Sequence, residues 1–512
     1  MTELHRTGAG EGLRRDILTT LLPAFDGPEA PQWVLDLLRE GLGGVCLFGS
    51  NVVSPGQLAA LTAALRAAGP ESVVAIDEEG GDVTRLFYDR GAPYPGNAVL
   101  GRLDLLEATE QVAREVGLAL REAGVTLTFA PDADVNSNPD NPVIGVRSFG
   151  ADPVLAARHT AAWVRGVQST GIAASAKHFP GHGDSATDSH LALPVLDVPE
   201  QVLVERELVP FRAAIEAGTA TIMTSHILLP QLDADLPATL SPRILHSLLR
   251  GELGFEGVIV TDALDMQGAS GERGIPEAAV LALVAGCDLL CIGSDVAPET
   301  VDAIVAAVTA AVDEGRLSPE RIADAAARVR ALARTQPDAS EPGAAGGTVQ
   351  PAPSPMGPAQ VARAFDIRPG ALDALRGARR VGTVVRVDTT ANIAIGEVPW
   401  GPFAAEAEAS APSWLSRAGI VVLAADAPLA DPAALPGPVL VVGKDLHRHA
   451  FAVAAIEGLR AVRDDVVTVD LGWPSTDRAV ADLATFGASR LVGDALIDVV
   501  GRALEADPAV LA

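Results

Sequence analysis

Residues 172–190 read IAASAKHFPGHGDSATDSH, a short apolar run followed by a polar loop that contains two glycines. The apolar run has the length and composition of a buried β-strand, and it ends at the reactive pair Lys177 and His178. This stretch therefore predicts a strand that delivers polar side chains to a glycine-rich loop.

Seven similar runs occur in the same part of the chain, and segments with helical spacing separate them. Alternating β and α elements predict a parallel sheet, and eight such units over about 330 residues predict a (β/α)8 TIM-type barrel. A doubly wound open sheet is the structural alternative. The runs are LTTLLPAF (18–25), GGVCLF (43–48), SVVAID (72–77), VTLTFAPD (125–132), IAASAKHF (172–179), ATIMTSH (220–226), GVIVTDA (257–263) and CDLLCIG (287–293).

Five consecutive runs end on reactive or hydrogen-bonding side chains. These are Asp77, Asp132, Lys177 with His178, Ser225 with His226, and Asp262. A single one of them is readily explained as a strand-end cap, but a barrel without a functional site has no need for all five. In a barrel, the carboxyl ends of the strands meet on one face, where barrel enzymes keep their chemistry. The sequence therefore predicts a site on that face.

A second domain follows a linker. Residues 337–358 are dominated by Pro, Gly, Ala and Ser and cannot bury enough surface to fold alone, so we expect domains at 1–336 and 359–512. The second domain is expected to be a smaller α/β sandwich, with strands over 379–387, 419–426, 438–445 and 466–472 and helices over 450–463, 477–487 and 491–506. Lys444, His447 and His449 are interpreted as a solvated loop, with a ligand role as the alternative.

Composition excludes several classes of protein. The formal net charge of −28 argues against a nucleic-acid binder. Three cysteines at no metal-like spacing indicate core residues rather than a disulfide framework, so a reducing compartment is expected. The N-terminus has no apolar signal-like stretch, and no run approaches the about 20 apolar residues of a membrane span. These features predict a cytoplasmic protein that binds neither nucleic acid nor membrane.

The loop from Lys177 to His190 allows three interpretations. A metal site would use His178, His182, Asp184, Asp188 and His190, but zinc sites have tighter spacings and the ammonium of Lys177 opposes a cation. An exposed polar turn is the plainest interpretation. The third is acid–base catalysis, in which Asp188 orients His190 so that the imidazole can donate and retrieve a proton.

A nucleophile is also needed. The chain has no G-x-S-x-G elbow, whereas Asp262 ends a buried run and would be rigidly placed. Asp265, three residues further on, is expected to have a structural rather than a catalytic role. A carboxylate nucleophile with a separate acid–base group is the arrangement of a retaining glycosidase.

Several motifs, in order, resemble the β-N-acetylhexosaminidases of glycoside hydrolase family 3. They are AIDEEGGDVTRL (75–86), NPVIGVRSFG (141–150), KHFPGHGDSATDSH (177–190), TIMTSHILLPQLD (221–233), PATLS (237–241) and LGFEGVIVTDALDM (253–266). The resemblance covers most of residues 15–335, and the histidine loop marks the cell-wall-recycling branch. Asp82 departs from the pattern, since a basic residue is common there.

The resemblance implies a role for each matching residue. Asp262 corresponds to the nucleophile, His190 to the acid–base group and Asp188 to its partner. His226 is undecided between the sugar pocket and packing. No metal or organic cofactor is implied. The positions that match sugar-binding ones are Asp77, Arg85, Arg147, Lys177 and His178.

The expected activity is release of terminal N-acetylglucosamine, with retention, from peptidoglycan- or chitin-derived fragments. A histidine acid–base group does not repel an anionic acceptor, so a phosphorylase that uses inorganic phosphate is one alternative. A β-glucosidase activity of the same site is another. The third is a catalytically silent sugar-binding protein.

Overall fold

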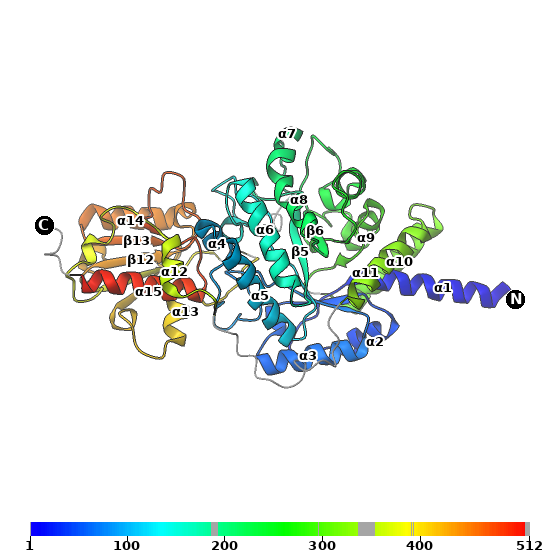
Figure 1. The fold of residues 1–512 in the computed structure, drawn as a ribbon, viewed down its shortest axis with the longest axis horizontal. Helices are drawn as coiled ribbons and strands as arrows, with labels where there is room; N and C mark the ends of the chain where they lie inside the picture. Colours follow the sequence, from blue (N-terminus) through cyan, green and yellow to red (C-terminus); the bar gives the residue numbers. More distant parts are fainter. Residues whose placement is uncertain are drawn as a thin grey trace. The chain divides into compact units, whose positions relative to one another are not determined.

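The computed structural model describes residues 2–185, 193–294, 296–335, 354–390, 392 and 394–506. The chain forms two compact units (Figure 1). The barrel unit comprises Met1–Glu79, Thr109–Ser137 and Ala151–Ala352, and the sandwich unit comprises Gly80–Ala108, Asn138–Gly150 and Pro353–Ala512. Most of the predicted linker lies outside the described residues, so the predicted boundaries at 336 and 359 stay a prediction.

Within its described residues, the barrel unit contains eight short parallel strands, one in each predicted run. They are β1 (Leu21–Leu22), β2 (Gly44–Leu47), β3 (Val73–Ile76), β4 (Leu127–Thr128), β5 (Ala173–Phe179), β6 (Thr221–Thr224), β7 (Val258–Val260) and β8 (Leu290–Cys291). Strands β2 to β7 pair in chain order, and β1 pairs with β8. A parallel bridge between Val260 and Leu289 joins β7 to β8, and the Cys46 amide donates to Pro23 between β2 and β1. The predicted (β/α)8 barrel is confirmed.

Helices connect the strands and cover the barrel (Figure 1). They include α2 (Gln32–Glu40), α3 (Pro55–Ala68), α5 (Leu106–Glu122), α6 (Pro153–Gln168), α8 (Leu208–Glu216), η5 (Arg243–Glu252), α9 (Gly274–Ala285), α10 (Pro298–Asp313) and α11 (Pro319–Arg334), with α1 (Thr2–Thr19) before β1. Three of them begin alike: Ser54, Asp152 and Ser318 each accept a hydrogen bond from a first-turn amide, and proline follows. Proline suits that position because its missing N–H would have no partner there.

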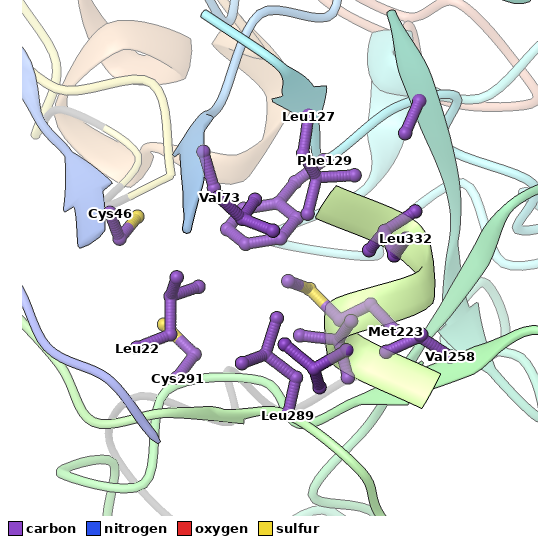
Figure 2. Packing of buried hydrophobic residues seen from close by; sticks show 14 of the residues in the cluster. Leu22, Cys46, Val73, Leu127, Phe129, Met223, Val258, Leu289, Cys291 and Leu332 are labelled. Atoms are coloured by element: carbon purple, nitrogen blue, oxygen red, sulfur yellow. The ribbon is translucent and has the colours of Figure 1, made fainter. Parts of the chain in front are cut away.

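The barrel is filled by apolar side chains from strands on all sides. Figure 2 shows Leu22, Cys46, Val73, Leu127, Phe129, Met223, Val258, Leu289 and Cys291, with Leu332 from α11 packed beside them. Every residue of the eight strands is buried, as expected for parallel strands covered on both faces. The three cysteines are free and buried, which confirms that they are core residues.

The sandwich unit is built on one six-stranded sheet with the order β11-β10-β12-β13-β14-β9. Helix α14 (Ala450–Val462) lies on one face and α15 (Arg490–Glu505) on the other (Figure 1). Other helices are α4 (Asn97–Leu103), α12 (Pro358–Val361) and α13 (Gly401–Glu408). The strands are β9 (Asp366–Ile367), β10 (Thr383–Val387), β11 (Gly419–Leu423), β12 (Val439–Gly443), β13 (Val466–Asp470) and β14 (Leu483–Ala484).

The helix predicted over 477–487 is wrong. Leu483 and Ala484 form strand β14, which pairs in parallel with β13 and antiparallel with β9. Both side chains are fully buried. Pairing on two sides satisfies the backbone of this segment, so tertiary contacts override a pattern that fits a helix by spacing alone.

In the part of the chain that the structure describes, no helix is both long and apolar enough to cross a membrane.

Candidate functional site

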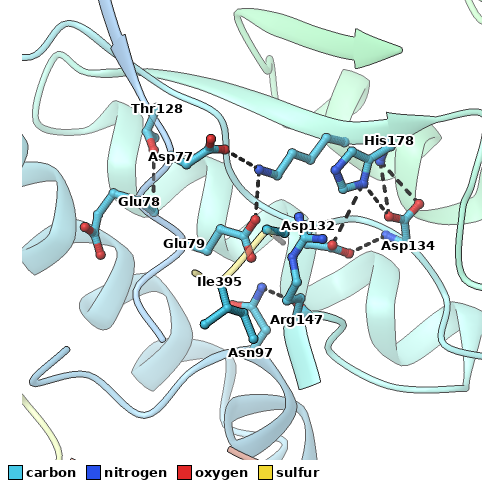
Figure 3. A network of polar contacts seen from close by, with 12 residues as sticks. Asp77, Glu78, Glu79, Asn97, Thr128, Asp132, Asp134, Arg147, His178 and Ile395 are labelled. Atoms are coloured by element: carbon cyan, nitrogen blue, oxygen red, sulfur yellow. Dashed lines mark hydrogen bonds and ion pairs between the residues drawn. The ribbon is translucent and has the colours of Figure 1, made fainter. Parts of the chain in front are cut away.

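The carboxyl ends of β3 and β5 are joined by one buried lysine. Lys177 lies within β5, and its Nζ is 2.7 Å from Oδ1 of Asp77 and 2.8 Å from Oε1 of Glu79 (Figure 3). The side chains of Lys177 and Glu79 are each 3% exposed, whereas Asp77 is 20% exposed. Two carboxylates around one ammonium hold all three groups in place, and Asp77 still reaches solvent.

Asp134 organises the backbone and the side chain that follow this lysine. Its Oδ2 lies 2.7 Å from Nδ1 of His178, and its Oδ1 accepts from the amide of His182 at 2.7 Å. The amide of His178 also donates to this carboxylate. Because Nδ1 faces a carboxylate, which can only accept, Nδ1 carries the proton.

Asp132, Asp134 and His178 are also the group that could hold a metal ion. One ligand atom from each lies within 4.8 Å of the others, and all three side chains are buried. Asp134, however, already accepts hydrogen bonds with both oxygens, and Asp132 Oδ1 accepts from the Asp134 amide at 3.0 Å. The group is thus well explained as a hydrogen-bonded support for His178.

Asp262 follows β7, and His226 follows β6. Nε2 of His226 lies 2.9 Å from the carbonyl oxygen of Ala263, and Nδ1 lies 2.9 Å from Oγ1 of Thr239. A carbonyl can only accept, so Nε2 carries the proton. The Ala263 amide donates to Oδ1 of Asp262 at 2.8 Å. His226 is fully buried and therefore braces the peptide next to Asp262.

Arg206 supports the first half of the histidine loop through two ion pairs, one with Asp184 of the loop and one with Glu207. Arg206 donates through NH2 to Oδ2 of Asp184 and through Nε to Oε1 of Glu207, both at 2.6 Å. Glu207 is fully buried, and its burial raises its pKa to about 7 although the Arg206 charge opposes the shift. A Cβ at Gly181 would lie 2.7 Å from Glu207.

The two glycines of the loop are needed for close packing. Gly181 has φ +132, and a Cβ at Gly183 would collide with the backbone oxygen of Val135. The predicted catalytic pair Asp188 and His190 lies outside the described residues. Their assignment stays a prediction.

Arg85 and Arg147 belong to the sandwich unit. Arg85 is buried and donates to the carbonyl oxygens of Ala394 at 2.7 Å and Ile395 at 3.2 Å. Arg147 is also buried; its NH1 donates to Val143, and its backbone carbonyl accepts from Asn97 (Figure 3). Each guanidinium is thus oriented by backbone carbonyls.

Two residues of the site were not predicted. Glu79 lies two residues after Asp77 and shares Lys177 with it, and Asp134 lies two residues after Asp132 and holds His178. Alternate residues of an extended segment face the same way, so this spacing was the available signal.

The loop around His447 in the sandwich unit differs from the prediction. The side chain of His447 is only 10% exposed and lies 3.4 Å from Oδ1 of Asp140, so it is not solvated. Burial lowers the pKa of His447 and of His449.

Known proteins resemble this chain over either the barrel or nearly its whole length. A family model described as glycosyl hydrolase family 3 N terminal domain matches residues 28–332. Beta-hexosaminidase A of Pseudoalteromonas piscicida is 35% identical over 328 residues, which covers 59% of this chain and 55% of that protein. The chain therefore spans just over half the length of that relative.

Two solved structures show the same relationship. A glycoside hydrolase family 3 β-N-acetylglucosaminidase from Paenibacillus sp. str. FPU-7 has 30% identity and a TM-score of 0.81, with 96% of this chain and 97% of that chain covered. NagZ from Neisseria gonorrhoeae, in complex with N-trifluoroacetyl-D-glucosamine, has 31% identity and a TM-score of 0.51, with 61% and 97% covered.

Proposed function

Because this chain belongs to glycosyl hydrolase family 3, we propose that it is a retaining β-N-acetylglucosaminidase that removes terminal N-acetylglucosamine. The predicted family is confirmed, and two of the relatives are named as a β-N-acetylglucosaminidase and a beta-hexosaminidase. The observation that carries the proposal is the buried cluster of Lys177, Asp77 and Glu79 at the carboxyl ends of β3 and β5.

The cluster suits a neutral sugar with many hydroxyls. Asp77 can accept from one hydroxyl while Lys177 donates to its neighbour, and both atoms are fixed before the sugar arrives. His178 lies on the same strand, and Asp134 fixes the orientation of its ring. For Arg85 and Arg147, a sugar-binding role stays a prediction from the motifs that they share with the family.

The reaction is a double displacement. The carboxylate of Asp262 attacks the anomeric carbon while His190, as the imidazolium, protonates the departing glycosidic oxygen. A covalent bond between Asp262 and the anomeric carbon forms, which gives the glycosyl-enzyme, and the aglycone leaves. Neutral His190 then takes a proton from water, whose oxygen attacks the same carbon and releases Asp262, so the configuration is retained. Asp188 stabilises the imidazolium form of His190, which is present before the first step and is formed again in the second.

His226 is assigned to positioning rather than to the sugar. Both of its ring nitrogens have protein partners, and one of these is the carbonyl of the residue that follows Asp262. A fixed peptide at this point keeps the nucleophile in line with the anomeric carbon.

Nitrophenol release from 4-nitrophenyl N-acetyl-β-glucosaminide in phosphate-free buffer tests the proposal. Clear turnover that phosphate does not increase supports hydrolysis. Turnover that requires phosphate and yields a sugar 1-phosphate makes the protein a phosphorylase. Turnover only of the β-glucoside makes it a glucosidase, and tight sugar binding without turnover makes it a silent binder.

The natural substrates that we propose are peptidoglycan- or chitin-derived fragments, met in the cytoplasm. The three free, buried cysteines support a reducing compartment. Exo-cleavage of a purified fragment by the full chain, followed by mass spectrometry, tests the substrate; failure on both fragment types while the nitrophenyl sugar is cleaved would reject this part alone.

A further inference from the structure

The sandwich unit contains a pocket where its sheet changes direction. Strands β10 and β12 are parallel neighbours, with Thr383 opposite Val439. The chain continues from β10 to β11 on one side and from β12 to β13 on the other. Open α/β sheets bind ligands beyond the carboxyl ends of the two strands at such a switch point.

The pocket at this place has a volume of about 760 Å³. Arg386 and Asp388, at the end of β10, and Lys444, directly after β12, line it. Trp400, just before α13, and Phe403, in the first turn of α13, complete this part of the lining. Its size fits a small ligand, and aromatic walls with a few charged groups are the composition of a ligand site.

The rings of Trp400 and Phe403 form one wall of the pocket, and the guanidinium of Arg386 lies close to both of them. The rings of Trp400 and Phe403 meet edge to face with centres 4.8 Å apart. The Arg386 guanidinium carbon lies 5.4 Å from the centre of Phe403 and 5.8 Å from that of Trp400. Arg386 is also held by Asp388 through two hydrogen bonds of 2.7 and 3.0 Å, so its charge is already balanced.

Lys444 differs from Arg386 in this respect. Its Nζ lies 5.6 Å from the centre of the Trp400 ring, and within the described ranges no carboxylate forms an ion pair with it. Lys444 is partly buried as a residue, so water screens an anion beside it less than at a fully exposed site.

The chain has 38 basic residues, and only Lys177 and Lys444 among them are lysines. Lys177 lies in the proposed sugar site, and Lys444 lines this pocket.

We propose that this pocket binds a small saccharide that carries one anionic group, with the anion on Lys444 and an apolar sugar face on Trp400. Glu397, also in the lining, and Asp388 disfavour ligands with many negative charges. The inference rests on the proposed function only for the choice of a saccharide; the anion site stands on Lys444.

Calorimetric titration of the full chain tests the proposal with four probes. N-acetylmuramic acid supplies a carboxylate, N-acetylglucosamine 6-phosphate supplies a phosphate, and N-acetylglucosamine and inorganic phosphate supply each half alone. Lys444→Met should weaken one or both acidic sugars at least tenfold, and the one affected identifies the anion. Binding of N-acetylglucosamine and hydrolysis of the neutral nitrophenyl sugar should not change.

Arg417→Met is the matched control, since it removes an exposed cation of the same unit outside the pocket. It should leave all four titrations unchanged, and thermal melting of both variants should match the parent. The proposal is overturned if Lys444→Met changes neither acid, weakens the neutral sugar equally, or if inorganic phosphate binds as tightly as the sugar phosphate. If the proposed enzymatic function is wrong, the parent chain itself will not hydrolyse the nitrophenyl sugar, whatever the titrations of the Lys444 variant show.

Discussion

The two lysines of this chain lie at corresponding places in two different sheets. Lys177 lies near the carboxyl end of β5, and Lys444 follows β12 directly. The ammonium of Lys177 is held by two carboxylates within 2.8 Å, whereas that of Lys444 faces an aromatic ring. A balanced ammonium is suited to neutral hydroxyls, and an unbalanced one is suited to an anion. The surroundings, rather than the residue type, decide what each lysine can bind.

The surroundings of the two lysines share a second feature. In each, a buried carboxylate accepts hydrogen bonds from backbone amides of the loop that follows a strand. Asp134 accepts from the amides of His178 and His182 and from the His178 ring. Asp470 accepts from the amides of Asp445, Leu446 and Gly472. Asp134 also orients the imidazole of His178, and for Asp470 the described residues show only contacts with backbone amides.

The largest effect should come from the nucleophile. Asp262→Ala should lower kcat roughly ten-thousand-fold, because the proposed mechanism assigns formation of the glycosyl-enzyme to this carboxylate. Added azide should restore part of the turnover and give an α-glycosyl azide, detectable by NMR. Asp265→Asn, three residues on, is the matched control and should keep at least about a tenth of the activity. Near-normal turnover by Asp262→Ala would place the chemistry elsewhere. In this variant, binding of N-acetylmuramic acid at Lys444 should not change.

The same substitution at both lysines separates the two regions directly. Lys177→Arg should lower kcat/KM about a hundredfold, because a planar fork cannot replace an ammonium between Asp77 and Glu79. Lys444→Arg should keep acidic-sugar binding within a few-fold, since the anion needs only a cation. Steady-state kinetics and calorimetry on both variants give the answer. Equal tolerance at the two positions would remove the distinction drawn between them.

Much of this site was predictable because the end of a buried strand constrains the next residue. The positions of Asp77 and Asp262 just after β3 and β7 followed from that rule, and Lys177 lies within the last residues of β5. Glu79 and Asp134 were not predicted, although each lies two residues after a predicted aspartate and the alternation of an extended segment was the available signal. Strand β14 was missed because its two residues are defined by partners far away in the sequence.

The third prediction concerns Glu207, whose carboxylate pairs with Arg206 next to the first half of the histidine loop. Its pKa is about 7 in the folded chain and ordinarily 4.5, so between these values the folded state binds more protons than the unfolded state. Stability should therefore fall as the pH rises through this window. Relative to the parent, Glu207→Gln should gain about 3 kcal/mol between pH 4.5 and 8.

Urea unfolding at both pH values measures this gain. Glu205→Gln, at an exposed position of the same helical segment, η3 (Leu203–Glu207), is the control and should show a flat difference. A difference between Glu207→Gln and the parent that does not change with pH would mean that Glu207 is already ionised throughout this range.

The smallest effect is expected at His226, which acts on the nucleophile only through a peptide. His226→Phe keeps the ring volume but loses the bonds to Thr239 and to the Ala263 carbonyl. It should lower kcat about tenfold and leave KM nearly unchanged, because the sugar-binding cluster is intact while Asp262 is less well aligned. His226→Gln can still donate to the carbonyl and should recover most of the loss. If KM instead rises as much as kcat falls, His226 contacts the sugar and belongs with Lys177.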